Sequence, residues 1–159
     1  MTRAQVWLSH MSNLIVTFTG IIYFVMLHFM TSDDAFSVVN HPLQPLVQHV
    51  HVLAAPLLTF AIGIIWTRHA APRAKRSDMP TWRSGIVLMA VCAPMIASGY
   101  LLQVSTEAEW RKVWMWLHVV SSVVWMLGYV SHVWRWVMAS FGSRPKPCIP
   151  IGQEATHVD

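Results

Sequence analysis

The stretch VWMWLHVVSSVVWMLGYVSHVWRWVM, residues 113–138, decides the fold that this sequence predicts. Its only Lys, Arg, Asp or Glu is Arg135, and the rest of the run is almost entirely apolar. A helix of this length crosses the roughly 30 Å hydrocarbon core of a bilayer. Because lipid offers no water to unpaired backbone groups, such a span has to be helical. The stretch therefore predicts a transmembrane helix.

Three more segments have the same character and are bounded by polar, Pro-rich or charged residues: 7–30, 46–66 and 84–102. The chain is 55% hydrophobic and only 11% charged. Soluble domains usually carry about 25% charged residues, so a water-facing surface is excluded. We predict an all-α integral membrane protein, with a four-helix bundle over residues 1–142 and an irregular cytoplasmic tail over residues 143–159.

The basic residues predict the orientation of this bundle. All but Arg111 and Lys112 of the 11 Lys and Arg residues fall at the N-terminus, between the second and third spans, at the end of the fourth span, or in the tail. The positive-inside rule therefore places both termini in the cytoplasm, and residues 31–45 and 106–112 on the outer side. We expect a multi-pass protein of the bacterial inner membrane. The net charge of +4 belongs to membrane edges and does not indicate nucleic-acid binding.

Nine histidines are unusual in so apolar a chain, and two of them lie on the last span. His118 and His132 are 14 residues apart, which is about 21 Å along a helix with a phase difference of about 40°. Both rings then point the same way at two depths. Ionisable residues inside spans are costly and usually functional. One helix can thus supply one axial ligand to each of two stacked haems; two hydrogen-bonded core histidines are the other interpretation.

Each iron needs a second ligand from another helix. For His118 we favour His51 over His49, because side chains two positions apart on a helix point about 200° apart and only one can face the interior. For His132 we favour His10 over His69. His69 lies about 27 Å along the second helix from His51, farther than the spacing on the last span, and it sits among arginines.

Other residues are candidates for a quinone site or for pairing with the haem propionates. A quinone beside one haem would need a titratable group, and the candidates are His28, His49 and His69. Haem propionates need cations near each membrane surface, and those available are Arg68, Arg73, Arg83, Arg111 and Lys112. Cys92 and Cys148 form no disulfide framework, and without a CxxCH sequence covalent c-type haem is not expected.

Three sequences carry a resemblance to a known family: WLSHMSN around His10, QHVHVLAAP around His51, and the segment WMWLHVVSSVVWMLGYVSHVW with His118 and His132. Over about residues 5–140 the chain resembles the small di-haem b-type cytochrome subunits of respiratory enzymes, such as formate dehydrogenase and membrane-bound nickel–iron hydrogenase. The resemblance implies that these four histidines bind the iron of two b-type haems.

Iron with two imidazole ligands has no open position, so it passes electrons and binds no substrate. We therefore expect an electron-transfer subunit of an oxidoreductase complex with no catalytic residue of its own. It would carry electrons between the quinone pool and a cytochrome or dehydrogenase at the outer face. The alternatives are a proton or metal transport component lined by histidines, and a cofactor-free structural subunit of a membrane complex.

Overall fold

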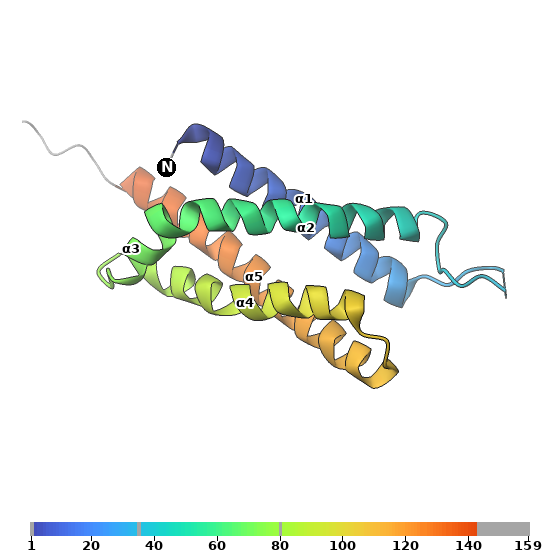
Figure 1. Ribbon diagram of the computed structural model, residues 1–159. Helices are drawn as coiled ribbons and strands as arrows, with labels where there is room; N and C mark the ends of the chain where they lie inside the picture. Colours follow the sequence, from blue (N-terminus) through green and yellow to red (C-terminus); the bar gives the residue numbers. More distant parts are fainter. Residues whose placement is uncertain (1, 35, 80, 143–159) are drawn as a thin grey trace, which may run out of the picture.

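The computed structural model describes residues 2–34, 36–79 and 81–142, and all regular structure in these ranges is helical (Figure 1). The elements are α1 (Arg3–Phe29), α2 (Gln44–Ile65), the π-helical turn η1 (Trp66–Ala70), α3 (Ala71–Ala74), α4 (Trp82–Val104) and α5 (Ala108–Gly142). The prediction of an all-α protein is confirmed. The predicted tail, with Cys148, lies outside the described residues.

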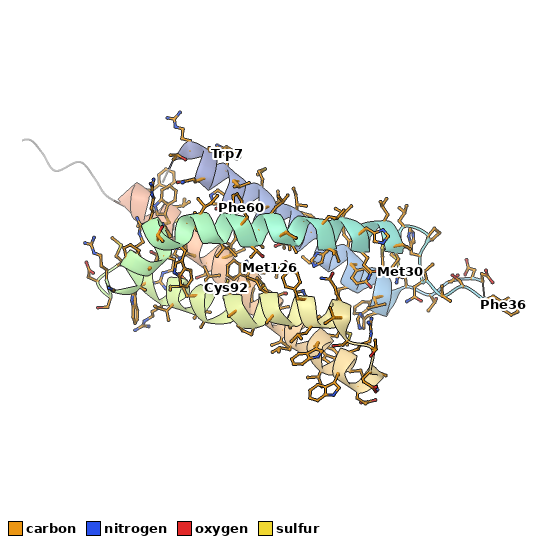
Figure 2. All side chains as sticks on the ribbon, in the orientation of Figure 1. Trp7, Met30, Phe36, Phe60, Cys92 and Met126 are labelled. Carbon is orange, nitrogen blue, oxygen red and sulfur yellow. The ribbon has the colours of Figure 1, made fainter. Side chains whose placement is uncertain are left out.

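Within the described residues, four helical runs are long and apolar enough to cross a membrane, as predicted: Arg3–Phe29, Gln44–Ala74, Trp82–Val104 and Ala108–Ala139. The second run is longer than the predicted span over residues 46–66, because η1 and α3 continue it without a break. Large apolar side chains point outward from these helices, for example Trp7 and Phe60, both 63% exposed (Figure 2). Such a surface suits lipid and does not suit water.

The four long helices form two hairpins. α1 packs along α2, and α4 packs along α5, whereas close backbone contacts between the two hairpins are few. A buried hydrogen bond joins the hairpins near their middle, where the indole Nε1 of Trp125 on α5 donates to Oδ1 of Asn13 on α1 at 2.8 Å. Cys92 and Met95 of α4 pack with Trp125 in the small buried core, and Figure 2 shows Cys92 and Met126 near the centre of the bundle.

The two ends of the bundle differ in what they carry. The start of α1, the short helix α3 and the end of α5 lie at one end, and the connection before α2 and the α4–α5 turn lie at the other (Figure 1). At this second end, Arg111 donates to the carbonyls of Leu102 and Ser105 and so closes the last turn of α4. Asn40 donates to the carbonyl of Leu27 and ties the α1–α2 connection to α1.

Candidate functional site

Two pairs of histidine rings bridge the space between the hairpins. The ring centroids of His51 on α2 and His118 on α5 are 6.3 Å apart, and those of His69 on η1 and His132 on α5 are 6.0 Å apart. We call these the 51/118 pair and the 69/132 pair. A metal bonded at about 2 Å to one nitrogen of each ring holds two imidazole centroids about 6 Å apart. Both centroid distances match that spacing, and the two rings of each pair meet edge to face, at interplanar angles of 82° for His51 and His118 and 70° for His69 and His132.

The ring of His51 is fixed by a hydroxyl on α1. Its Nδ1 lies 3.1 Å from Oγ1 of Thr19. The single hydroxyl proton of Thr19 is donated to the carbonyl of Ile15 at 2.8 Å, so the oxygen accepts from Nδ1–H of His51. A neutral imidazole with its proton on Nδ1 carries a free lone pair on Nε2. His51 is therefore in the tautomer that binds a metal through Nε2.

The same arrangement fixes His118 from α4. Nδ1 of His118 donates to the carbonyl of Met95 at 3.0 Å and lies 3.4 Å from Oγ of Ser98. Ser98 gives its own proton to the carbonyl of Pro94 at 2.6 Å, so its oxygen is an acceptor as well. Both contacts place the His118 proton on Nδ1 and leave Nε2 unprotonated.

His132, at the other depth on α5, has the same kind of hydrogen bond. Its Nδ1 lies 3.1 Å from Oγ of Ser84, and Ser84 donates its proton to the carbonyl of Thr81 at 3.0 Å. Nδ1–H of His132 is thus the donor, and Nε2 is free. Metal-binding histidines almost always donate their other ring N–H to an oxygen in this way, since the hydrogen bond fixes both the tautomer and the ring orientation.

A glycine lies beside each of these three rings. A Cβ added to Gly20 would lie 3.0 Å from Cε1 of His51, and one added to Gly99 would lie 3.1 Å from Cε1 of His118. For Gly85 and His132 the corresponding distance is 3.6 Å. The rings of the 51/118 pair thus lie against helix backbone with no room for another side chain, whereas His132 has ordinary van der Waals space.

The support for the rings forms a pattern that the histidines alone did not reveal. A hydroxyl–glycine dipeptide faces each of the three rings, and the three are Thr19–Gly20, Ser84–Gly85 and Ser98–Gly99. The two on α4 are 14 residues apart, the same interval as between His118 and His132. Sequence reasoning missed Ser84 and Ser98. The signal that could have found them is the 14-residue interval, which recurs on the helix that packs against the one carrying His118 and His132.

His69 has a different environment. Nη1 of Arg73 lies 2.6 Å from Nδ1 of His69, one helical turn away along the chain. A guanidinium can only donate, so Nδ1 of His69 accepts and its proton is on Nε2. The π-helical turn carries His69 to the ring of His132, because a π turn holds more residues than an α turn and changes the direction in which following side chains leave the helix.

The structure does not bring His10 to His132. His10 hydrogen-bonds through Nδ1 to the hydroxyl of Tyr129, three residues before His132, and the two rings meet edge to face. Among the described residues, the histidine ring in contact with His132 is that of His69. Coordination by His10 stays a prediction, and the pair that the structure forms uses His69, which the sequence left as the alternative.

The remaining candidates lie apart from the two pairs. His49 is exposed on α2, on a different face from His51. His28 stacks on Phe24 with centroids 4.4 Å apart, donates to the carbonyl of the same residue, and lies 6.5 Å from Trp116. These contacts hold the ring at the end of α1, and they include neither histidine pair.

The basic residues that were candidates to pair with haem propionates have different environments. Arg111 is bonded to carbonyls at the end of α4, and Lys112 pairs with Glu109 at 2.9 Å. Arg68 and Arg83 are exposed. Within the described residues, no group of three or more His, Cys, Asp or Glu side chains is placed to hold a metal ion.

Comparison of the chain with protein families, with curated proteins and with solved structures finds no match.

Proposed function

We propose that this chain is a membrane-embedded b-type cytochrome subunit. One haem b would be held by His51 and His118, and a second by His69 and His132. The observation that carries the proposal is the combination of ring spacing and tautomer. Both pairs have metal spacing, and three of the four rings have Nδ1–H bonded to an oxygen with Nε2 free.

The residues present fit such a group. The helical run Gln44–Ala74 and α5, which carry the paired histidines, make few close backbone contacts, although helices packed directly on each other lie only about 8–10 Å apart. A flat macrocycle needs space of this kind between its two ligands. When bound, haem supplies reversible one-electron chemistry, and the protein supplies ligands, orientation and exclusion of water.

The middle of the bundle supports a path between two sites. Trp125 is seven residues from His118 and seven from His132, which is about 10 Å along the helix axis in each direction. Its indole is buried and held by Asn13. A fixed aromatic side chain thus stands between the proposed haem positions, which supports transfer between them along α5.

The proposed partners are the quinone pool and a separate cytochrome or dehydrogenase within a membrane complex. The connection before α2 supports the second partner, because Phe36 and Val38 there are 95% and 98% exposed. Figure 2 shows Phe36 at the tip of this connection, away from the helices. In the proposed orientation this end faces the outside of a bacterial inner membrane.

A visible spectrum tests the function. The full chain, purified in detergent, is expected to give a sharp reduced α-band in a dithionite-minus-air difference spectrum. A pyridine haemochrome assay would then give the haem content per chain. A colourless protein would contradict the proposal. It would return the chain to the two alternatives, a histidine-lined transport component or a cofactor-free subunit, neither of which absorbs there.

A further inference from the structure

We propose that an open groove at the end of the second helical run binds the head group of one anionic phospholipid. The groove has a volume of about 520 Å³ and is lined by Trp66, Thr67, Ala71, Pro72 and Lys75. Ligand pockets in proteins are typically about 300–1,000 Å³, so a lipid head group fits this volume. The inference goes beyond the proposed function and does not depend on haem.

The length of α2 places the groove at the surface of the bilayer. α2 has 22 residues, which is about 33 Å along its axis, and the hydrocarbon core is about 30 Å thick. Because α2 alone is long enough to cross that core, η1 and α3 follow it at the level of the head groups, at one end of the bundle (Figure 1). Trp66 suits this level, since its ring is apolar and its N–H is polar.

The π turn brings the lining residues together. The N–H of Ala71 donates to the carbonyl of Trp66, five residues earlier, so these two residues lie on adjacent turns near one another. On a regular α-helix they would lie about 140° apart. Lys75 follows Ala71 by four residues and shares its face one turn later. A small residue, Ala71, therefore lies between a large ring and a long cationic side chain.

Lys75 supplies the charge that a phosphate needs. Arg76 pairs with Asp78 at 4.0 Å and Arg73 donates to His69, whereas Lys75 has no ion-pair partner among the described residues. The same holds for hydrogen bonds from the hydroxyl of Thr67, which has no partner within that part of the chain. Polar groups that face lipid without a partner are costly, and a lipid phosphate offers acceptors to both.

The surroundings favour a lipid over a free anion. Ala71, Pro72 and the ring of Trp66 give the groove an apolar lining, which suits glycerol and the first methylenes of acyl chains. Between residues 66 and 83 five residues are basic and one is acidic. Basic segments next to a membrane span attract anionic lipids. The groove thus combines an apolar lining with a cation in a basic segment, and an anionic phospholipid has the matching chemistry.

Binding is tested by native mass spectrometry on the full-length chain, stripped of lipid in detergent and titrated with phosphatidylglycerol. The first phosphatidylglycerol should bind at least about fivefold more tightly than phosphatidylcholine with the same acyl chains. Lys75→Gln should weaken it about fivefold, the size expected for one basic residue at an anionic surface. Ala71→Leu, which fills the groove without changing the charge, should also weaken it. Arg76→Gln removes the neighbouring charge outside the groove and is the matched control, with little change expected.

Equal weakening by Lys75→Gln and Arg76→Gln would overturn the site, because it would show diffuse attraction to the basic segment. Unchanged binding in Lys75→Gln or in Ala71→Leu, with helical content confirmed by circular dichroism, would overturn it too. Displacement of the lipid by inorganic phosphate would show that the occupant is a free anion and would overturn the assignment to lipid.

A second measurement uses the unaltered chain in a bilayer. Phosphatidylglycerol with a photoactivatable group close to its glycerol is mixed into phosphatidylcholine liposomes that contain the chain, and the adducts are mapped by peptide mass spectrometry. Adducts should concentrate on residues 66–75, and labelling spread evenly over the four spans would overturn the site. A chain that binds this lipid and no haem would overturn the proposed function and leave the lipid site intact.

Discussion

The 51/118 pair and the 69/132 pair have almost the same ring spacing, and yet they are built differently. Each ring of the 51/118 pair is supported by the other helix of its own hairpin, His51 by α1 and His118 by α4. In the 69/132 pair only His132 has such support, and His69 faces a guanidinium. In the proposed sites, readiness to bind a metal is therefore decided by the group that faces Nδ1 of each ring, which is an acceptor for His51, His118 and His132 and a donor for His69.

The largest expected effect is the loss of one haem at a time. His118→Ala should remove the haem of the 51/118 pair and leave the other, and His132→Ala should do the reverse, because each iron loses one of only two protein ligands. Pyridine haemochrome content per chain is the measurement. His49→Ala is the control beside His51→Ala. If His118→Ala and His132→Ala both keep full haem content, the two pairs are not the sites.

His69 and His10 are the two candidates for the second ligand beside His132. His69→Ala should lose the haem of the 69/132 pair, whereas His10→Ala should keep it and lose only a hydrogen bond to Tyr129, a cost of about 1 kcal/mol. Haem content and thermal unfolding measured on both variants separate the two effects. Loss of haem in His10→Ala but not in His69→Ala would make His10 the ligand, as first predicted from the sequence.

Substitution of the glycines should weaken haem binding at the two pairs to different degrees, with a smaller effect than loss of a histidine. Gly20→Ala and Gly99→Ala place a methyl group 3.0–3.1 Å from a ring carbon of the 51/118 pair. Overpacking of this kind costs about 1–3 kcal/mol, so haem should bind there about 5- to 150-fold more weakly in a titration. Gly85→Ala, at 3.6 Å from His132, should be tolerated, and Gly63→Ala, with nothing within 4 Å, is the control. Equal weakening by all four would remove the distinction.

The smallest expected effect comes from the hydroxyl groups. Thr19→Val keeps the shape of the side chain and removes the oxygen that accepts from His51, which should weaken haem binding about tenfold. Ser98→Ala should do less, since the Met95 carbonyl still accepts from His118. Haem release to a scavenger such as apomyoglobin gives the rates. A larger effect from Ser98→Ala than from Thr19→Val would show that the hydroxyl and not the carbonyl fixes His118.

The four helices were predictable because a membrane sets a minimum length of apolar residues, and each span of this chain satisfies it. The alignment of His118 and His132 was predictable as well, because both lie on one regular helix. The contact between His132 and His69 was not predictable. The prediction treated the second span as an α-helix ending at residue 66, whereas the chain passes through a π turn and stays helical to Ala74. Nothing in the residues of η1, WTRHA, marks such a turn.

The role of the glycines was also not predictable from the sequence. Each could serve close helix packing or leave room for a cofactor, and a single sequence cannot choose between these. In the structure Gly20 and Gly99 make room for histidine rings instead, and Gly85 lies in ordinary contact with a third. That role depends on which helices are neighbours, which hydropathy does not encode. Once α4 and α5 are known to form a hairpin, the repeated Ser–Gly dipeptides become informative.

The equal 14-residue intervals on α4 and α5 have one more consequence. If one of these helices slid past the other by a turn, Ser84 and Ser98 would leave both rings together, so the hairpin has a single matched alignment. The separation of His118 from His132 is set by the rise of α5 alone, because both residues lie on this one helix. If haem binds as proposed, a neighbouring subunit or a change in bilayer thickness that displaces α1 and α2 would alter the bond between each iron and its histidine on the first hairpin, and hence its redox potential. The distance that electrons travel between the two positions would stay the same.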